Sequence, residues 1–424
     1  MRDSTAAKHL NLNVRGLGNS ATVAINDRSN ALRREGRRVF KLGLGQSPFP
    51  VPGSVVQSLR DHAHEKDYLP THGLEALRGS VARHTHRAVG VERGASDVLI
   101  GPGSKELMFI LQLSFYGDLI IPAPSWVSYG PQASIIGRKV RHIATTEASG
   151  WRLTPEGLSE VCAQDPGRPR LLILNYPNNP TGLSYSDEEL KALAAVARQE
   201  GILLLSDEIY GELNHRGAHT SIARHYPEGT IISSGLSKWC GAGGWRLGTF
   251  VFPPELGWLR EAMTAVASET FTSTAAPIQY AAITAFDGNA EIDEYLLRSR
   301  RVLRAMGGWI AARLRSADIA CSDPEGGFYH LPSFEAHREK LAARGITDAP
   351  TLCERLLQET GVAILPGDAF GRPAGELTAR LAYVDFDGAA ALEGAGREHL
   401  DEAWLRAHCG DVLEAIDCVC QWVS

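Results

Sequence analysis

The stretch Ser233-Ser-Gly-Leu-Ser-Lys-Trp-Cys-Gly-Ala-Gly-Gly-Trp-Arg-Leu-Gly248 contains a lysine, Lys238, among small residues, and an arginine, Arg246, eight positions later. A lysine amine in such surroundings can form an imine with the aldehyde of pyridoxal phosphate, and small neighbours let the ring and the phosphate come close. The guanidinium of Arg246 can hold the phosphate through two parallel hydrogen bonds. Taken alone the pattern is a weak signal, because most lysines are solvated surface groups.

The bulk composition indicates a globular protein of two or so domains. The chain has 424 residues, of which 44% are apolar and 22% charged, and this length exceeds one ordinary core. A net charge of -6 argues against a nucleic-acid or acidic-membrane partner. No apolar run reaches membrane-spanning length, and the first residues lack a hydrophobic signal core. The seven scattered cysteines favour reduced thiols and no metal site, so we expect a cytoplasmic enzyme.

Strand and helix patterns alternate from about residue 75. Apolar strands are predicted at 97–100, 119–121, 170–174, 202–207 and 230–234, with helices at 74–89, 105–115 and 186–199. This alternation predicts an α/β fold with a mostly parallel sheet covered by helices on both faces. Ligands of such sheets bind beyond the carboxyl ends of the strands, where the segment 101–105, Asn179, Asp207 and Lys238 fall.

The remainder of the chain predicts a smaller α+β domain. A helix at 292–314, a strand at 327–331, a helix at 349–360 and strands at 362–365 and 379–384 follow the sheet region. A helix near 20–35 and a strand at 39–45 precede it, and we expect their residues to share the core of this smaller domain. The predicted division is 1–55 for the N-terminal arm and part of the small domain, 56–300 for the large cofactor-binding domain and 301–424 for the C-terminal small domain.

Polar residues at the predicted strand ends fit the needs of pyridoxal phosphate. Asp207 can hold a proton on the pyridine nitrogen, which makes the ring an electron sink. Tyr210 and Asn179 can donate to the phenolic oxygen, which lowers the pKa of the imine. Each residue also has an ordinary interpretation, since Asp207 could be a cap before a turn, Asn179 a turn residue before Pro180 and Tyr210 a buried ring on a helix face.

Two further groups complete the set. Gly103, Ser104 and Lys105 follow a strand and open a helix, so their amides suit a phosphate, to which Ser237 and Arg246 can add donors. The pair Gly101-x-Gly103 lacks the third glycine of a dinucleotide fingerprint, so a nicotinamide site is less favoured. Arg380 begins an apolar strand and is costly to bury without an anion. It is either a clamp for a substrate carboxylate or part of a structural salt bridge.

Together these features resemble the class I/II aminotransferases, the fold-type-I pyridoxal phosphate family that includes aspartate aminotransferase. The resemblance covers nearly the whole chain and is carried by several motifs. They are Ser20-Ala-Thr-Val-Ala-Ile-Asn26, Leu44-Gly-Gln46, Tyr68-Leu-Pro-Thr-His-Gly-Leu-Glu-Ala-Leu-Arg78, Asn178-Asn-Pro-Thr-Gly182, Ser206-Asp-Glu-Ile-Tyr210, Ser237-Lys238, Gly244-Trp-Arg-Leu-Gly248, Pro324-Glu-Gly-Gly-Phe-Tyr329, Gly361-Val-Ala-Ile-Leu-Pro-Gly-Asp-Ala-Phe-Gly371 and Arg380-Leu-Ala-Tyr383.

The resemblance implies a role for each candidate residue. Lys238 would be the Schiff-base lysine, Asp207 the partner of the pyridine nitrogen, and Asn179 and Tyr210 ligands of the phenolic oxygen. Trp126 would stack on the ring and Arg246 would hold the phosphate. Arg380 would clamp the substrate carboxylate, which the Gly45 backbone would also touch. Tyr68 would reach the phosphate of the neighbouring subunit, so a homodimer with shared active sites is expected.

The sequence departs from the family pattern around the lysine. Relatives usually carry serine three residues before it as a phosphate ligand, whereas this chain has Gly235. Ser234 or Ser237 could take over that role. A threonine of many relatives is replaced by Gly243. The bulk of Trp239 is expected to affect the shape of the pocket, and Cys240 is either a reactive thiol or a small buried one.

The expected reaction is a two-stage exchange of an amino group between an L-amino acid and a 2-oxo acid with ping-pong kinetics. A β-eliminating or ring-forming lyase, or an amino-acid oxidase or decarboxylase, are alternatives on the same fold, and a catalytically silent binding protein is a further one. Lys105 leaves the substrate open. In one interpretation its side chain meets the distal carboxylate of an acidic substrate, as in some relatives that use aspartate. In the other, only its backbone amide acts, and it binds the phosphate.

Overall fold

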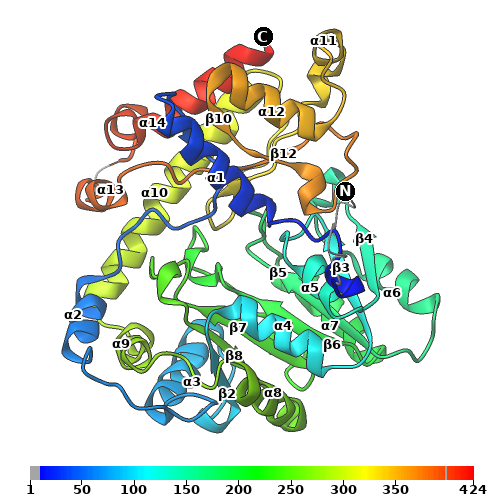
Figure 1. Ribbon diagram of the computed structural model, residues 1–424, viewed down its shortest axis with the longest axis vertical. Coiled ribbons are helices and arrows are strands. Elements are labelled where there is room, and N and C mark those ends of the chain that lie inside the picture. The colour runs from blue at the N-terminus through cyan, green and yellow to red at the C-terminus, as the bar shows by residue number, and fades with distance from the viewer. Residues whose placement is uncertain (1–9, 397–398) are drawn as a thin grey trace, which may run out of the picture.

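A computed structural model describes residues 10–396 and 399–424, and a seven-stranded sheet lies at the centre of its larger domain (Figure 1). The first nine residues of the predicted arm lie outside the described residues. The strand order is β2-β8-β7-β6-β5-β3-β4, and only β8 runs antiparallel to its neighbours. The predicted mostly parallel sheet is therefore confirmed. Its strands are β2 (Val98–Gly101), β3 (Asp118–Ala123), β4 (Val140–Ala144), β5 (Arg170–Asn175), β6 (Leu203–Asp207), β7 (Thr230–Gly235) and β8 (Gly248–Val251).

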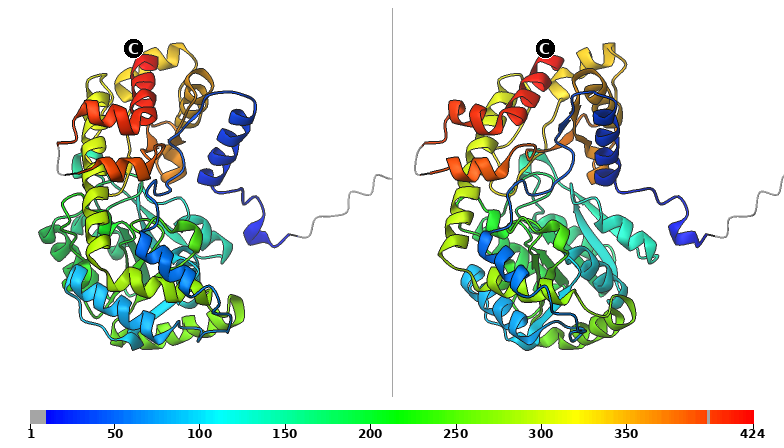
Figure 2. Two further views of the ribbon diagram at one scale, coloured as in Figure 1. Left: turned by 90° about the vertical axis from the view of Figure 1, so that its left-hand side faces the viewer. Right: turned by 60° about the vertical axis from the view of Figure 1, so that its left-hand side comes forward.

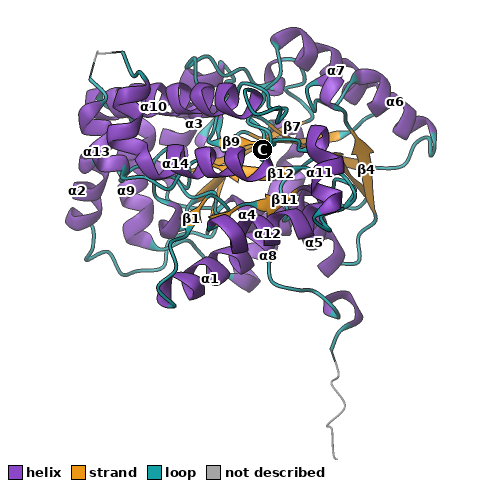
Figure 3. Ribbon diagram, turned by 90° about the horizontal axis from the view of Figure 1, so that it is seen from above, coloured by secondary structure: helices purple, strands orange, loops and turns teal. Residues whose placement is uncertain are grey.

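Helices cover both faces of this sheet, which explains why its central strands are apolar along their whole length (Figure 3). In β6, Leu203 and Leu205 pack toward one layer of helices, whereas Leu204 packs toward the other. The first layer consists of α4 (Ser104–Ser114), α5 (Tyr129–Ile135) and α8 (Gly257–Thr270). The second consists of α3 (Glu75–Val89), α6 (Pro155–Ala163), α7 (Asp187–Gln199) and α9 (Ala276–Asp287), with α2 (Gly53–Asp61) packed on α9.

The smaller domain combines residues 21–41 with the C-terminal part of the chain (Figure 2). Strand β1 (Phe40–Lys41) pairs in parallel with β10 (Val362–Ala363), and β11 (Leu365–Pro366), β12 (Ala379–Ala382) and β9 (Tyr329–His330) form an antiparallel sheet. Its helices are α1 (Ala21–Arg34), α10 (Ala290–Arg315), α11 (Arg338–Ala343), α12 (Ala349–Thr360), α13 (Gly388–Gly394) and α14 (Glu402–Val423). Helix α10 runs through residue 300, and the division at 55 and 300 stays a prediction.

Local capping explains where the predicted helices begin and end. In α7, the Ser186 hydroxyl accepts from the Glu189 amide at 3.2 Å and the Glu189 carboxylate accepts from the Ser186 amide at 2.7 Å. This is the capping box expected from the sequence. Helix α12 has the predicted bounds, because Asp348 caps its first turn and Gly361 ends it with a φ of 78°.

The short strands of the smaller domain differ from the prediction. The strand expected at 362–365 is divided into β10 and β11, because Ile364 lies where the chain leaves one small sheet and enters another. The strand expected at 39–45 is ordered as a strand only at Phe40–Lys41. Within residues 10–396 and 399–424, no helix combines the length and the apolar character needed to cross a membrane.

Candidate active site

A cavity of 560 Å³ lies beyond the carboxyl ends of the parallel strands, where the smaller domain meets the sheet. It brings together residues that are distant in the sequence and that come from both domains. The candidate residues lining it are Gly45, Ser104, Lys105, Trp126, Asn179, Asp207, Tyr210, Ser237, Lys238, Arg246 and Arg380. Two other candidates, Gly103 and Tyr68, do not line it.

Lys238 follows the end of β7 and directs its amine into the cavity. Its Nζ atom donates a hydrogen bond to the carbonyl oxygen of Gly45 at 2.7 Å. Burial, together with the positive charges of Arg380 and Arg246, lowers the pKa of Lys238 from 10.5 to about 8. A larger fraction of this amine is therefore neutral, and able to attack a carbonyl carbon, than for a lysine in water.

Asp207 ends β6 and is almost completely buried. The hydroxyl of Tyr129 donates to its Oδ2 at 2.5 Å, and the hydroxyl of Ser233 donates to its Oδ1 at 3.3 Å. Burial raises the pKa of Asp207 to about 6, while these two donors oppose the shift. The site thus contains a carboxylate that lacks a cationic partner among the described residues and that a protonated ring nitrogen would satisfy.

Tyr210 and Asn179 lie close to Asp207 and Lys238. The hydroxyl of Tyr210 lies 2.8 Å from that of Tyr329, and the Nζ atom of Lys238 lies 5.8 Å from the Tyr210 ring centroid. The backbone amide of Asn179 donates to the Asn175 side chain at 2.8 Å, and the Asn179 side-chain oxygen accepts from Arg380. This arrangement leaves the side-chain NH₂ of Asn179 able to donate to a ligand.

Arg380, in β12, is only 1% exposed. Its Nη1 atom donates to the Asn179 side-chain oxygen at 3.2 Å, and its Nη2 atom donates to the Gly43 carbonyl oxygen. Its Nε atom is buried and has no hydrogen-bond partner among the residues that the structure describes. Among residues 10–396 and 399–424, no carboxylate forms an ion pair with Arg380, so the structural salt bridge that the sequence left open is not found there.

The segment before α4 can hold an anion. Ser104 begins this helix, so backbone amides and the positive end of the helix dipole face the cavity. A Cβ on Gly103 would lie 2.1 Å from Nη2 of Arg246, and Gly103 has a φ of 94°. The absence of a side chain at Gly103 therefore lets the Arg246 guanidinium approach the start of the helix.

The structure clarifies the departures around the lysine. A Cβ at position 235 would lie 2.6 Å from the carbonyl oxygen of Leu247, so the close approach of the two strands leaves no room there for serine. Ser237 lines the active-site cavity, whereas Ser234 lines a separate cavity of 670 Å³. Of the two serines considered as replacements, only Ser237 is placed to contact a ligand.

The expected effect of Trp239 on the active-site pocket is not found. Its ring faces the separate 670 Å³ cavity and stacks on His84, with ring centroids 6.0 Å apart. Cys240 is fully buried, and burial raises the pKa of its thiol to about 12. This agrees with the interpretation of Cys240 as a small buried thiol.

Lys105 and Trp126 occupy one wall of the cavity. The ammonium of Lys105 lies 5.0 Å from the Trp126 ring centroid. Desolvation and the charge of Arg246 lower the pKa of Lys105. Both side chains are thus within reach of a ligand bound between Asp207 and Arg246.

Tyr68 lies outside this cavity, in the loop between α2 and α3, and is 91% exposed.

Three residues at the site were not predicted from the sequence: Tyr129, Ser233 and Tyr329. The partners of Tyr129 and Tyr329 lie 78 and 119 residues away along the chain, so no local pattern connects them.

The charges of the cavity fit pyridoxal phosphate and a carboxylate substrate. Four cationic side chains line it, namely Lys105, Lys238, Arg246 and Arg380, and among the described residues Asp207 is the one acidic side chain that does so. A phosphate group and a substrate carboxylate would balance this excess of positive charge. The unpaired Nε of Arg380 points to the same need for an anion.

Comparisons with known proteins agree with this chemistry. The family model described as "Aminotransferase class I and II" matches residues 37–384. An aspartate aminotransferase of Geobacillus stearothermophilus is 33% identical over 382 residues, which cover 88% of this chain and 93% of that relative. An asparagine–oxo-acid transaminase of Streptococcus mutans is 31% identical over 376 residues, which cover 86% and 92%. The structure of aspartate aminotransferase from Thermus thermophilus with maleate matches with a TM-score of 0.85 at 27% identity, covering 98% of this chain and all of that one.

Proposed function

The chain belongs to the class I and II aminotransferase family and is a pyridoxal-phosphate-dependent transaminase of fold type I. We propose that it transfers the amino group of an acidic amino acid, L-aspartate above all, to a 2-oxo acid. Transamination is favoured over the lyase, oxidase and decarboxylase outcomes, because the relatives compared above are named as aminotransferases or transaminases. The two half-reactions use one site, so ping-pong kinetics are expected.

We assign the bond-forming and proton-moving role to Lys238. Pyridoxal phosphate, when bound, supplies an electron sink that stabilises negative charge on the substrate Cα. The Lys238 amine would hold the cofactor at its aldehyde carbon, with release of water. When free, the partly neutral amine would accept the proton of the substrate Cα. The lowered pKa of Lys238 supports both tasks.

The other residues of the cavity orient the cofactor. All four residues line the cavity. Asp207 would keep a proton on the pyridine nitrogen, Tyr210 and Asn179 would donate to the phenolic oxygen, and Trp126 would stack on the ring. The phosphate would be held by the backbone amides of Ser104 and Lys105 and by the side chains of Ser104, Ser237 and Arg246. The predicted role of the Gly103 amide is not supported, because this amide donates to the carbonyl oxygen of Gly101 at 2.7 Å.

Tyr68 acts in the second subunit of a homodimer. Its side chain is exposed and lies outside the cavity of its own chain, so it would have to act elsewhere. We propose that it completes the phosphate site of the partner, so that two chains share their active sites. We further propose that this homodimer is a cytoplasmic enzyme.

One observation carries the proposal: Arg380 is buried at the site without a carboxylate partner among the described residues. A substrate carboxylate would form a bidentate pair with it, and the Gly45 backbone adjoins the same space. Such a pair fixes which Cα bond stands perpendicular to the cofactor ring, and so which bond breaks.

The charge of Lys105 supports an acidic substrate. Arg246 is assigned to the phosphate, Arg380 to the α-carboxylate and Lys238 to the cofactor aldehyde, so Lys105 is the cationic side chain of the lining that remains without an assigned partner. The distal carboxylate of aspartate would supply that partner. The opposing interpretation is that only the Lys105 backbone amide acts, at the phosphate.

The test is to add amino acids one at a time to the yellow, cofactor-loaded protein and to follow the loss of colour and the release of 2-oxo acid. L-Aspartate is expected to react with the highest kcat/KM. Lys105→Ala should raise KM for aspartate about 10- to 100-fold, the value of one charged hydrogen bond, and leave KM for alanine unchanged. Lys191→Ala, on the exposed face of α7, is the control. An equal loss for aspartate and alanine would exclude the distal-carboxylate role.

A further inference from the structure

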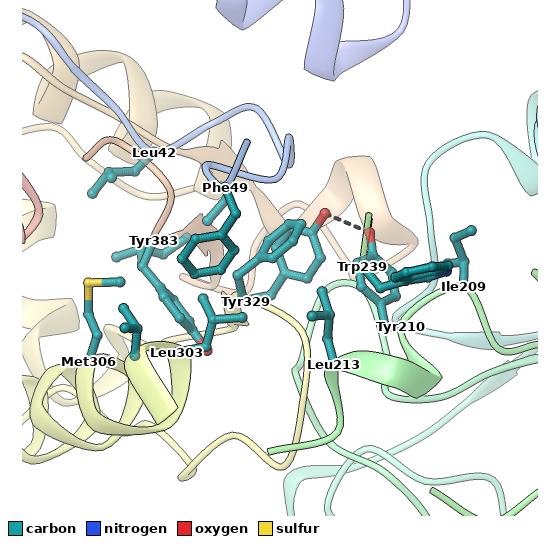
Figure 4. Close-up of a cluster of buried hydrophobic side chains, with 14 of the residues drawn as sticks. Leu42, Phe49, Ile209, Tyr210, Leu213, Trp239, Leu303, Met306, Tyr329 and Tyr383 are labelled. Atoms are coloured by element: carbon teal, nitrogen blue, oxygen red, sulfur yellow. Dashed lines mark hydrogen bonds between the residues drawn. The ribbon is translucent and has the colours of Figure 1, made fainter. Parts of the chain in front are cut away.

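Tyr329 reaches into the active-site cavity from β9 of the smaller domain. Its hydroxyl oxygen lies 2.8 Å from that of Tyr210, which belongs to the larger domain. Figure 4 draws this hydrogen bond as a dashed line. Tyr329 is 1% exposed and Tyr210 is 3% exposed. The two rings meet edge to face, with centroids 5.5 Å apart at an interplanar angle of 84°. A buried hydrogen bond between two hydroxyls therefore connects the domains at the site.

The number of protons fixes the direction of this hydrogen bond. A tyrosine hydroxyl has one proton to donate and can accept at its oxygen. If Tyr210 gives its proton to the phenolic oxygen of the cofactor, it must accept the proton of Tyr329. The hydrogen bond of 2.8 Å then places the hydroxyls in series, with Tyr329 as the first donor and Tyr210 as the second.

The position of the Tyr329 hydroxyl is restricted by its neighbours. A Cβ on Gly45 would lie 1.9 Å from this oxygen, so a residue with a side chain at position 45 would displace it. The guanidinium carbon of Arg380 lies 4.9 Å from the Tyr329 ring centroid, which is a favourable cation–π distance. Tyr329 is thus held between two residues that we assign to the substrate carboxylate.

We propose that Tyr329 is a positioning residue, which donates to Tyr210 and thereby directs the single proton of Tyr210 to the phenolic oxygen of the cofactor. This inference rests on the proposed function. Hydrogen bonds in series polarise one another, so a Tyr210 that also accepts is a stronger donor. Negative charge on the phenolic oxygen is then better stabilised, so this oxygen attracts the proton of the lysine–cofactor link less strongly. The pKa of that link is therefore lowered.

Charged groups from three strands face this pair. They are Arg380 in β12, Asp207 at the end of β6, and Lys238 after β7, and their charges act on Tyr210 or Tyr329. All three remain when only the Tyr329 hydroxyl is removed. A change in the pH titration of Tyr329→Phe therefore reports the hydroxyl itself.

The measurement is the pH titration of the visible absorption of the cofactor-loaded protein. In Tyr329→Phe the midpoint of this titration should lie about 0.5 pH unit above that of the unchanged protein. A shift of this size corresponds to a fraction of the free energy of one hydrogen bond. Tyr383→Phe is the matched control. The Tyr383 hydroxyl is equally buried and donates to the Gly327 carbonyl oxygen at 3.4 Å, but it does not line the cavity, so its removal should leave the midpoint unchanged.

A double-variant cycle tests whether Tyr329 acts through Tyr210. Tyr210→Phe alone should raise the midpoint by more than Tyr329→Phe, and adding Tyr329→Phe to it should produce no further shift. The proposal is overturned by an unchanged midpoint in Tyr329→Phe or by an equal shift in both backgrounds. A lower midpoint also overturns it, because Tyr210 would then be the donor to Tyr329. Failure of the proposed function differs from all three, because it would appear as no release of a 2-oxo acid from L-aspartate, whereas the midpoint is measured without a substrate.

Discussion

The hydroxyl of Tyr129 lies 2.5 Å from Oδ2 of Asp207, and both side chains are buried beneath the active-site cavity. Tyr129 begins α5, whereas Asp207 ends β6, so the first helical layer supports the sheet at the residue proposed to hold the cofactor ring. Burial raises the pKa of Asp207 to about 6 although Tyr129 donates to it. The ionised carboxylate is therefore costly in the absence of a cationic ligand.

Asp207→Asn is expected to separate stability from function. The folded-state pKa of Asp207 exceeds that of an ordinary aspartate, so the cofactor-free protein loses stability as the pH rises from about 4 through about 6. Replacement by asparagine should stabilise the cofactor-free protein at neutral pH by about 1–3 kcal/mol, observed as a higher Tm. The same variant should lower kcat at least about 100-fold. A lower Tm with unchanged kcat would contradict both assignments.

The capture of cofactor by Lys238 should depend on pH with a midpoint of about 8. The neutral amine is the nucleophile, and the lowered pKa means that it forms above about pH 8, so the rate should rise with pH and become constant above that value. Arg380→Met removes a nearby positive charge that lowers this pKa, and the midpoint should move upward. The midpoint is measured by stopped-flow absorbance, in which cofactor-free protein is mixed with cofactor at a series of pH values. Arg198→Met, which removes a surface arginine paired with Glu228, should leave the midpoint in place.

Gly103→Ala should weaken cofactor binding. A methyl group there would meet the Arg246 guanidinium at 2.1 Å, so the arginine must move away from the phosphate site. We expect Kd for the cofactor to rise about tenfold or more, the value of one charged hydrogen bond. Gly90→Ala is the control, because Gly90 has a similar positive φ of 71° and the described part of the chain places no atom within 4 Å of the added methyl group. It should lower Tm slightly and leave Kd unchanged; an equal rise in Kd for both variants would assign the effect to backbone strain.

Mixed dimers test the proposed role of Tyr68. Lys238→Ala lacks the amine in each of its sites, and Tyr68→Ala lacks the proposed phosphate contact in each of its own. Subunit exchange between the two proteins creates one site with both residues intact, so activity at limiting cofactor should exceed that of either parent. Two chains that mix without any gain in activity would show that Tyr68 does not serve the site of a partner.

The alternation of apolar strands and helices, together with polar residues at the strand ends, predicts where this site lies in the fold. Asp207, Asn179 and Lys238 follow apolar strands, and the parallel sheet brings their carboxyl ends to one edge. The residues that were not predicted act across long sequence separations. Tyr329 enters from the smaller domain to meet Tyr210, and this contact depends on how the two domains pack.

Some local features also depend on contacts that a sequence pattern does not contain. Strand β8 lies directly after Arg246 and was not predicted; it runs antiparallel to both of its neighbours. Its close approach to β7 explains Gly235, because the Leu247 carbonyl oxygen occupies the space of a side chain. Trp239 was expected at the active-site pocket and faces the other way, toward His84.

The most direct test of the central claim is to reduce the cofactor-loaded protein with borohydride, digest it and locate the added cofactor by mass spectrometry. The modification is expected on the peptide that contains Lys238, and Lys238→Ala should be unmodified and unable to release a 2-oxo acid from L-aspartate. Modification of a different lysine, or full turnover by Lys238→Ala, would contradict the assignment.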